Sequence, residues 1–251
     1  MDKWKYYDIR HKRHLLCNPM NKEKFERLCR LLRLESEARV LDIACGKGEF
    51  LIRLAELHHI SGVGVDISPY CISDCLKKRR NRVPNCNVEF IEMDGAKYKP
   101  ERSESFDLTM CIGASWIYGG YRGTLCALKK MTKQGGLIIV GEPFWLKEPS
   151  EEYLKADKMK REDFRTHYEN VKAGEKEGLT CIYTMASNHD DWDHYETLGW
   201  WSINEYKKTN PNDQDNPELL KRKNCEKETY LRWGRETLGW AIYVFRKKRR
   251  S

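Results

Sequence analysis

Acidic residues at the ends of consecutive predicted strands are the residues of this sequence best suited to ligand chemistry. The first, Asp42, lies in Val-Leu-Asp-Ile-Ala-Cys-Gly-Lys-Gly (residues 40–48), where an apolar strand turns through two glycines into a helix. Glycines in such a turn let a ligand approach the backbone, because no Cβ stands in the way. The next strand ends in Asp66, twenty residues after Gly46, and a carboxylate there can accept hydrogen bonds from both hydroxyls of an adenosyl ribose.

A third acidic residue, Asp94, follows the next predicted strand in Glu-Met-Asp-Gly-Ala (residues 92–96) and is expected beside an adenine ring. Open α/β sheets bind ligands at the carboxyl ends of their strands, where the strand order reverses. We therefore expect the three carboxylates to line one binding site. A dinucleotide does not suit this site, because its fingerprint needs a small residue where Leu51 stands, and because Asp42 would repel a phosphate.

Alternating strands and helices must position these carboxylates. The apolar pattern predicts strands at 39–44, 62–66, 87–92, 106–112 and 136–141. Between them it predicts helices near 50–57, 69–80 and 122–131. This alternation is typical of a parallel sheet with helices on both faces.

After residue 141 the alternation breaks. Helical patterns cover 150–173, 191–208 and 217–236, and further strands are predicted at 179–186 and 238–245. We expect the last strand to be antiparallel and to lie at an edge of the sheet, because its residues alternate. Near the amino end, Asn21 is a predicted cap for a helix that reaches about Arg33.

The predicted organisation has four parts. Residues 1–37 form an N-terminal lid and a helix, and residues 38–142 form the ligand-binding core. Residues 143–178 form a cap inserted over the carboxyl ends of the strands, and residues 179–251 complete the sheet and add helices on the substrate side.

Residues 38–142 resemble the class I S-adenosylmethionine (SAM)-dependent methyltransferases, through the motif at residues 40–48 and the acidic strand ends. The first motif of that family has a Gly-x-Gly-x-Gly core, and in this sequence Ala44 replaces the first glycine. The resemblance implies an α/β, Rossmann-like methyltransferase fold: a mostly parallel seven-stranded sheet with an antiparallel last strand and a helical cap insertion. Two later segments, 141–145 and 230–240, resemble a prokaryotic group of such enzymes whose substrate is unassigned.

The same resemblance implies a cofactor site for SAM, with S-adenosylhomocysteine as product and no metal. An acidic residue in the turn suits SAM, because the cofactor carries an ammonium and a sulfonium. Asp66 would hold the ribose, Ile67 would pack on the adenine and Asp94 would bind the adenine amino group. The residues expected to bind the cofactor are Asp42, Ala44, Gly46, Gly48, Asp66, Ile67, Asp94, Gly95 and Ile112.

A small-molecule methyl acceptor is the favoured expectation. The loop at 111–120 has no Asn/Asp-Pro-Pro-Tyr motif, and the chain has no Pro-Cys dipeptide, which disfavours two kinds of nucleic-acid methylation. Dense aromatic residues outside the core could exclude water and pack around a small substrate. The residues expected to contact the acceptor are Trp116, Tyr118, Trp145 and Trp192. An RNA- or protein-directed methyltransferase and a non-catalytic SAM-binding protein remain open as alternatives.

Methyl transfer requires that the acceptor be aligned with the methyl carbon on the sulfonium, and the acceptor must also lose a proton. The candidates for assisting that proton transfer are His14, Glu142 and Tyr7, in no order that the sequence fixes. A metal site is not expected at Asn188–Tyr195, because its histidines lack helical spacing and a partner cluster. That segment is expected to cap the following helix.

Composition limits the remaining choices. Ten scattered cysteines without a Cys-x-x-Cys pair indicate reduced thiols and a cytoplasmic location. The net charge of +8 comes largely from two basic runs, 77–82 and 246–250, which could bind nucleic acid but are more often solvated. The apolar runs are too short to cross a membrane, and no signal peptide is expected. The oligomeric state is left open.

Overall fold

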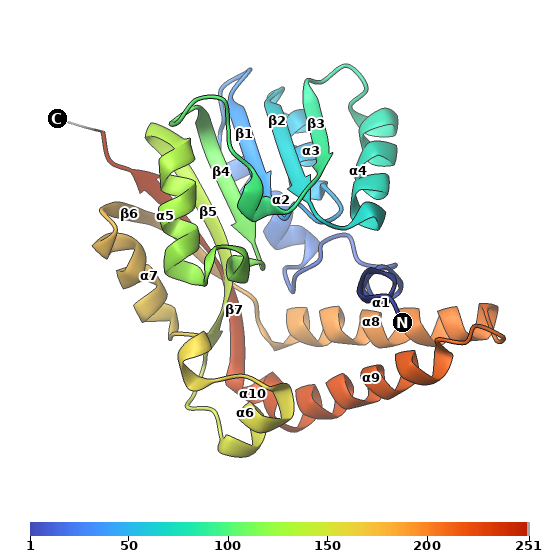
Figure 1. Cartoon of the computed structure of the whole chain (residues 1–251). Helices are drawn as coiled ribbons and strands as arrows, with labels where there is room; N and C mark the ends of the chain where they lie inside the picture. Colours follow the sequence, from blue (N-terminus) through green and yellow to red (C-terminus); the bar gives the residue numbers. More distant parts are fainter. Residues whose placement is uncertain (250–251) are drawn as a thin grey trace.

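A seven-stranded sheet organises the molecule in the computed structural model, which describes residues 1–249 (Figure 1). Its strand order is β3-β2-β1-β4-β5-β7-β6, with β7 antiparallel to both of its neighbours and the other pairs parallel. The Rossmann-like methyltransferase fold expected from the sequence is thus confirmed. The strands are β1 (Arg39–Ile43), β2 (Ser61–Asp66), β3 (Val88–Glu92), β4 (Phe106–Ile112), β5 (Thr132–Trp145), β6 (Leu179–Ala186) and β7 (Leu238–Lys247).

Helices cover both faces of this sheet. On one face α2, α3 and α4 pack on the strands around Leu28, Leu51 and Ile72, and on the other α5 and α7 pack around Leu125 and Val171. Burial on both faces explains why the central strands are almost wholly apolar. The helices of this part of the chain are α2 (Lys22–Leu31), α3 (Glu49–His58), α4 (Pro69–Arg82), α5 (Tyr121–Met131) and α7 (His167–Lys176).

The predicted edge position of the last strand is wrong. β7 lies between β5 and β6, and its side chains from Trp240 to Phe245 are buried on both faces. A strand inserted between two others in a sheet covered by helices has no solvent face, so its apparent alternation carries no information about an edge. The antiparallel direction expected for it is confirmed.

The predicted helix at 150–173 is also interrupted. It is divided into α6 (Glu151–Asp157), a short 3-10 turn and α7, which starts after the N-cap Thr166. Lys158 ends α6 in the left-handed region with φ of 55°, and Thr166 forms a bridge with Trp145 at the end of β5. The connection back to β5 therefore overrides the local helical pattern.

A group of helices lies beyond the carboxyl ends of the parallel strands, where Figure 1 shows α1 beside α8, with α9 below. These are α1 (Lys3–Arg10), α8 (His189–Thr209) and α9 (Asn216–Thr229), followed by a π-turn (Tyr230–Gly234) and α10 (Arg235–Thr237). Asn188 caps α8 as predicted, because its side chain accepts a hydrogen bond from the Asp191 N–H. Within residues 1–249, no helix is long and apolar enough to cross a membrane.

Candidate active site

The turn between β1 and α3 is built for close approach to its backbone. Ala44, Gly46 and Gly48 have φ of 58°, 53° and 70°, in the left-handed region that favours glycine. A Cβ at Gly48 would lie 2.8 Å from the Cys75 sulfur, so this glycine is required for packing. At Gly46 a Cβ would meet only the Cys17 side chain, at 3.6 Å, so this side of the turn faces space that a ligand can use.

Asp42 lies at the bottom of this turn and is 3% exposed. Among residues 1–249, its carboxylate has neither a hydrogen bond nor an ion pair. Burial, together with the nearby Asp66 carboxylate, holds the pKa of Asp42 well above its usual range. A cation next to Asp42 would offset the free-energy cost of burying its negative charge, and the ammonium of a bound SAM is such a cation.

Asp66 ends β2 beside the same turn. One carboxylate oxygen accepts a hydrogen bond from the Gly46 N–H at 2.9 Å, and the other accepts one from the Ser68 N–H at 2.8 Å. Burial raises the pKa of Asp66, and the backbone N–H groups oppose that rise. These bonds fix the carboxylate at the carboxyl end of β2, the place where the family resemblance expects the ribose.

The expected adenine side of the site is more open. Ile67 is 47% exposed and available for packing on a ring. Asp94 accepts a hydrogen bond from the Ala96 N–H at 3.0 Å, which orients the turn after β3. Gly95 is buried, and its carbonyl accepts a hydrogen bond from the Tyr118 hydroxyl at 3.0 Å. Tyr118 therefore supports the predicted cofactor turn rather than lying free for an acceptor.

Residues 15–18 cover the glycine turn. Together with Asp42, the turn residues and Ile112, they enclose a cavity of about 40 Å³. Lys47 holds this cover, because its Nζ donates a hydrogen bond of 2.6 Å to the His11 carbonyl. A space this small holds only a few water molecules, so binding of a cofactor there requires the covering segment to move.

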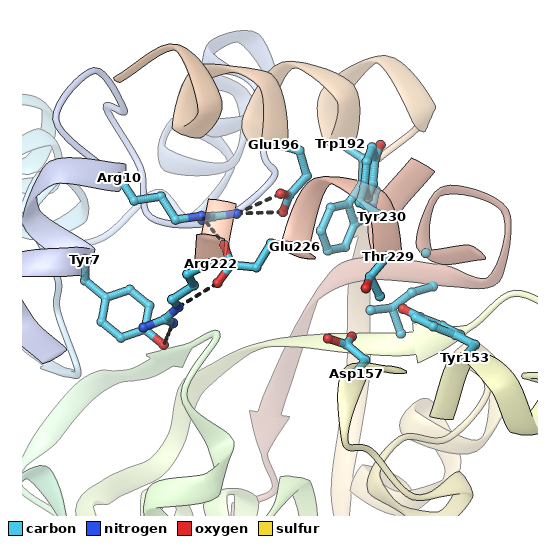
Figure 2. Close-up of a pocket in the computed structure, with 12 residues that line it drawn as sticks. Tyr7, Arg10, Tyr153, Asp157, Trp192, Glu196, Arg222, Glu226, Thr229 and Tyr230 are labelled. Atoms are coloured by element: carbon cyan, nitrogen blue, oxygen red, sulfur yellow. Dashed lines mark hydrogen bonds and ion pairs between the residues drawn. The ribbon is translucent and has the colours of Figure 1, made fainter. Parts of the chain in front are cut away.

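A second and larger pocket, about 220 Å³, lies between helices α1, α6, α8 and α9 (Figure 2). We call it the helix pocket. Aromatic and charged side chains make up most of its wall. Its lining residues are Tyr7, Arg10, Tyr153, Asp157, Trp192, Glu196, Arg222, Glu226, Thr229, Tyr230, Gly234 and Leu238.

An ion-pair network, buried at Arg10 and Glu196 and partly exposed at Arg222 and Glu226, forms one side of the helix pocket. Arg10 donates two hydrogen bonds from one nitrogen to Glu196, at 2.9 and 2.8 Å, and its Nε lies 3.4 Å from Glu226. Glu226 also accepts hydrogen bonds from the Tyr6 hydroxyl (2.6 Å) and from Arg222 (2.9 Å). Burial raises the pKa of Glu196, and the neighbouring guanidinium of Arg10 opposes that rise. The network ties α1 to α8 and α9.

One side chain connects the two cavities. The Tyr195 hydroxyl accepts a hydrogen bond from Arg10 at 3.4 Å and donates one of 3.5 Å to the Cys17 carbonyl. Arg10 lines the helix pocket, and Cys17 lines the cavity over the glycine turn. Tyr195 therefore links a residue that lines one cavity to a residue that lines the other.

The predicted catalytic residues do not come together. Tyr7 lines the helix pocket, where its hydroxyl accepts a hydrogen bond from Arg222 at 3.3 Å. His14 lies in the layer between the cavities, with Nε2 2.7 Å from the Tyr195 carbonyl, and burial lowers its pKa to about 4. Because a carbonyl only accepts, Nε2 carries the proton, and Nδ1 has no partner within residues 1–249.

Glu142, the third candidate, is buried on the opposite face of the sheet, toward α5. It accepts a hydrogen bond from the Ser115 hydroxyl at 2.7 Å, and burial raises its pKa to about 7. It lines neither cavity. The roles of these three residues in proton transfer stay predictions.

The residues predicted to contact the acceptor are equally scattered. Trp192 lines the helix pocket, whereas Trp116 is 73% exposed after β4. Trp145 is buried in a separate cluster beside α6, where its indole N–H donates a hydrogen bond of 2.9 Å to the Arg161 carbonyl. Of the four, Trp192 alone belongs to the helix pocket.

The buried carboxylate at Asp42, the left-handed glycine turn and the fixed acid at the end of β2 fit SAM, and on this fold they define a SAM-dependent methyltransferase. The chain belongs to the methyltransferase domain family, whose model matches residues 34–208.

Several relatives match over almost the whole chain. A SAM-dependent methyltransferase from Thiobacillus denitrificans, solved with S-adenosylhomocysteine, has a TM-score of 0.89 and 34% identity, covering 98% of this chain and 99% of its own. A second from Geobacter sulfurreducens, in complex with the same product, has a TM-score of 0.89 and 29% identity, covering 96% and 97%. The uncharacterized protein YjhP of Escherichia coli is 30% identical over 97% of this chain and 98% of its own length.

Sequence reasoning missed most of the helix pocket. Arg222 and Glu226 stand four residues apart on α9, a spacing that predicts an ion pair on one helix face. No comparable signal joins Arg10 to Glu196, which are 186 residues apart in the chain. Asp157 lies in the predicted helix at 150–173, and that helical pattern does not indicate a pocket.

Proposed function

We propose that this methyltransferase acts on a small-molecule acceptor bound in the helix pocket. The observation that carries this proposal is a pocket of about 220 Å³ that is walled by helices and linked through the hydrogen bonds of Tyr195 to the cavity over the glycine turn. Pockets for drug-sized ligands measure about 300–1,000 Å³, so this one suits a smaller molecule.

The chain's own residues would divide the work as follows. Asp42 and the turn at Gly46 would hold the methionine part of SAM, and Asp66 would hold the ribose. Bound SAM supplies an electrophilic methyl group on sulfur. The walls of the helix pocket, including Tyr7 and Trp192, would orient the acceptor and exclude water. Alignment of the acceptor with the methyl group would lower the barrier to transfer.

The basic runs do not favour a polyanionic substrate. In the first run, Lys78 and Arg82 form ion pairs with Glu49 at 2.8 and 2.7 Å, and Arg82 also pairs with Glu56. In the second, Lys247 is buried in β7 and donates hydrogen bonds to Glu104 and to two backbone carbonyls. In each run, part of the positive charge is thus paired within the fold.

A pocket-filling variant tests the proposal. A Cβ at Gly234 would lie 3.3 Å from the Tyr153 hydroxyl and 3.5 Å from the Tyr230 ring, so Gly234→Leu places a side chain in the pocket. We expect normal SAM affinity by calorimetry and at least a tenfold loss of methyl transfer to the low-mass fraction of a cell extract. Cys225→Leu, at an exposed position of α9 outside the pocket, is the matched control. Full turnover by a folded Gly234→Leu variant would place the acceptor elsewhere.

A further inference from the structure

The helix pocket has one more negative charge than positive charges. Its five charged side chains are two guanidiniums, Arg10 and Arg222, and three carboxylates, Asp157, Glu196 and Glu226. The guanidiniums form ion pairs with Glu196 and Glu226. Asp157 is the carboxylate left over, and within residues 1–249 it has neither a hydrogen bond nor an ion pair.

Asp157 carries this charge at an exposed position on the pocket wall. It is the last residue of α6, where the partial negative charge of a helix C-terminus disfavours another anion. Figure 2 shows its carboxylate across the pocket from Arg222, beside Thr229 and Tyr153. Since its charge stabilises neither the helix nor a partner side chain, this exposed carboxylate on the pocket wall is free to pair with a ligand.

Aromatic rings complete the binding surface. Tyr153 and Tyr230 are almost fully buried, and the partly buried Trp192 lies beside Tyr230, with 6.3 Å between the two ring centroids. Faces of tyrosine and tryptophan attract cations, most strongly when water is excluded. A free carboxylate next to such rings is the arrangement that recognises an organic ammonium.

The guanidiniums do not offer an equal site for an anion. All three nitrogens of Arg10 have partners, in Glu196, Glu226 and the Tyr195 hydroxyl. Arg222 is bound to Glu226 and stacks on the Tyr6 ring at 3.6 Å. An anionic ligand would have to break these contacts and would also face the Asp157 charge.

We infer that the acceptor molecule carries a protonated amine, which pairs with Asp157 among the rings of Tyr153, Trp192 and Tyr230. This inference rests on the proposed function and adds the chemical class of the acceptor. It concerns recognition of the cation, whichever atom of the molecule receives the methyl group.

The test begins with methyl-labelled SAM and the low-mass fraction of a cell extract. The labelled product is passed over a cation exchanger and an anion exchanger at neutral pH, and we expect retention on the cation exchanger. With the isolated product's precursor as substrate, Asp157→Asn should raise KM by about ten- to a hundredfold while kcat and SAM affinity stay within twofold. Glu151→Gln, on the same helix but outside the pocket, should leave KM unchanged.

A direct binding probe supplies the second arm. Tetramethylammonium should raise the melting temperature of the protein saturated with S-adenosylhomocysteine, and Asp157→Asn should abolish that rise, whereas acetate at equal ionic strength should have no effect. A labelled low-mass product that is anionic or neutral, or a KM insensitive to Asp157→Asn, would overturn the amine inference alone. Label found only in RNA or protein would overturn the proposed function itself.

Discussion

Lys47, in the glycine turn after β1, donates a hydrogen bond of 2.6 Å to the main-chain carbonyl of His11 and so fastens the amino-terminal segment over the expected cofactor cavity. The two residues are 36 positions apart in the chain. The bond links the turn that is expected to bind SAM to the segment that would have to open for SAM to enter.

The first prediction concerns this cover. Lys12 and Arg13 are exposed next to the buried His11, so trypsin can reach them whenever the segment opens. We expect saturating S-adenosylhomocysteine to slow cleavage there about tenfold or more, because the ligand stabilises the closed segment. Lys47→Met should lose most of that protection, since the His11 carbonyl loses its donor.

Gel analysis of cleavage with and without ligand measures this effect, and Lys22→Met, at an exposed position of α2, serves as the control. Equal cleavage rates for the wild-type chain in both states would show that the segment is not a lid. His14 and Tyr7 would then lose their support as site residues.

A second prediction concerns Asp66. Asp66→Ala should weaken SAM binding by about ten- to a hundredfold, because hydrogen bonds to a charged group contribute about 1.5–3 kcal/mol. It should also lower the melting temperature, since the Gly46 and Ser68 N–H groups lose their acceptors. The SAM affinity and melting temperature of Asp66→Asn should lie between those of the wild type and Asp66→Ala, because asparagine retains one acceptor oxygen. Calorimetry that finds wild-type affinity in folded Asp66→Ala would remove this residue from the site.

The third prediction follows from the pKa of Glu142, which burial raises from 4.5 to about 7. The folded chain holds this proton more tightly than the unfolded chain, so stability should fall as the pH rises from about 4.5 to about 7 and then level off. The fall amounts to roughly 3 kcal/mol for a shift of this size. Glu142→Gln should remove it, making the variant more stable than the wild type at pH 8 and similar at pH 4.5.

Urea unfolding at several pH values checks this, and the same variant addresses catalysis. Parallel stability curves for the two chains would show that the pKa of Glu142 is the same in the folded and the unfolded chain. If Glu142→Gln keeps its turnover as well as its SAM affinity, the predicted role of Glu142 in proton transfer is lost.

A fourth prediction concerns the carboxyl end. β7 runs antiparallel to β5, so the carboxyl end of β7 lies beside the amino ends of the parallel strands. The glycine turn lies at the other ends of those strands. Deleting residues 248–251 should leave turnover of a small acceptor unchanged. Extending the deletion to Lys247 should lower the melting temperature by several degrees, because Lys247 donates to two buried carbonyls and to Glu104. A large loss of turnover from the shorter deletion, reproduced by salt in the full chain, would point to a polyanionic substrate.

The cofactor half of the molecule could be predicted from sequence because its signals are local. The bounds of β4 and β6 match the expected 106–112 and 179–186, and the glycine turn carries its information within nine residues. The place of β7 between β5 and β6 could not be predicted, because pairing between distant strands leaves no periodic mark in either one.

The helix pocket lay outside sequence reasoning for a similar reason. Its network joins α1 to α8 and α9 through Arg10, Glu196 and Glu226, which are far apart in the chain. Burial of such charges is rare, and nothing in the local sequence marks Arg10 or Glu196 as buried. The aromatic segments were predicted to contact an acceptor, but their residues separate into the pocket, the core and the surface.

The measurement that tests the central claim most directly is the fate of the methyl group. The purified chain is incubated with methyl-labelled SAM and a whole-cell extract, and label is then counted in the low-mass, RNA and protein fractions against the amount of S-adenosylhomocysteine formed. We predict label in the low-mass fraction equal to the product formed, with the signal lowered at least tenfold by Gly234→Leu. Label in RNA or protein, or SAM binding without any transfer, would contradict it.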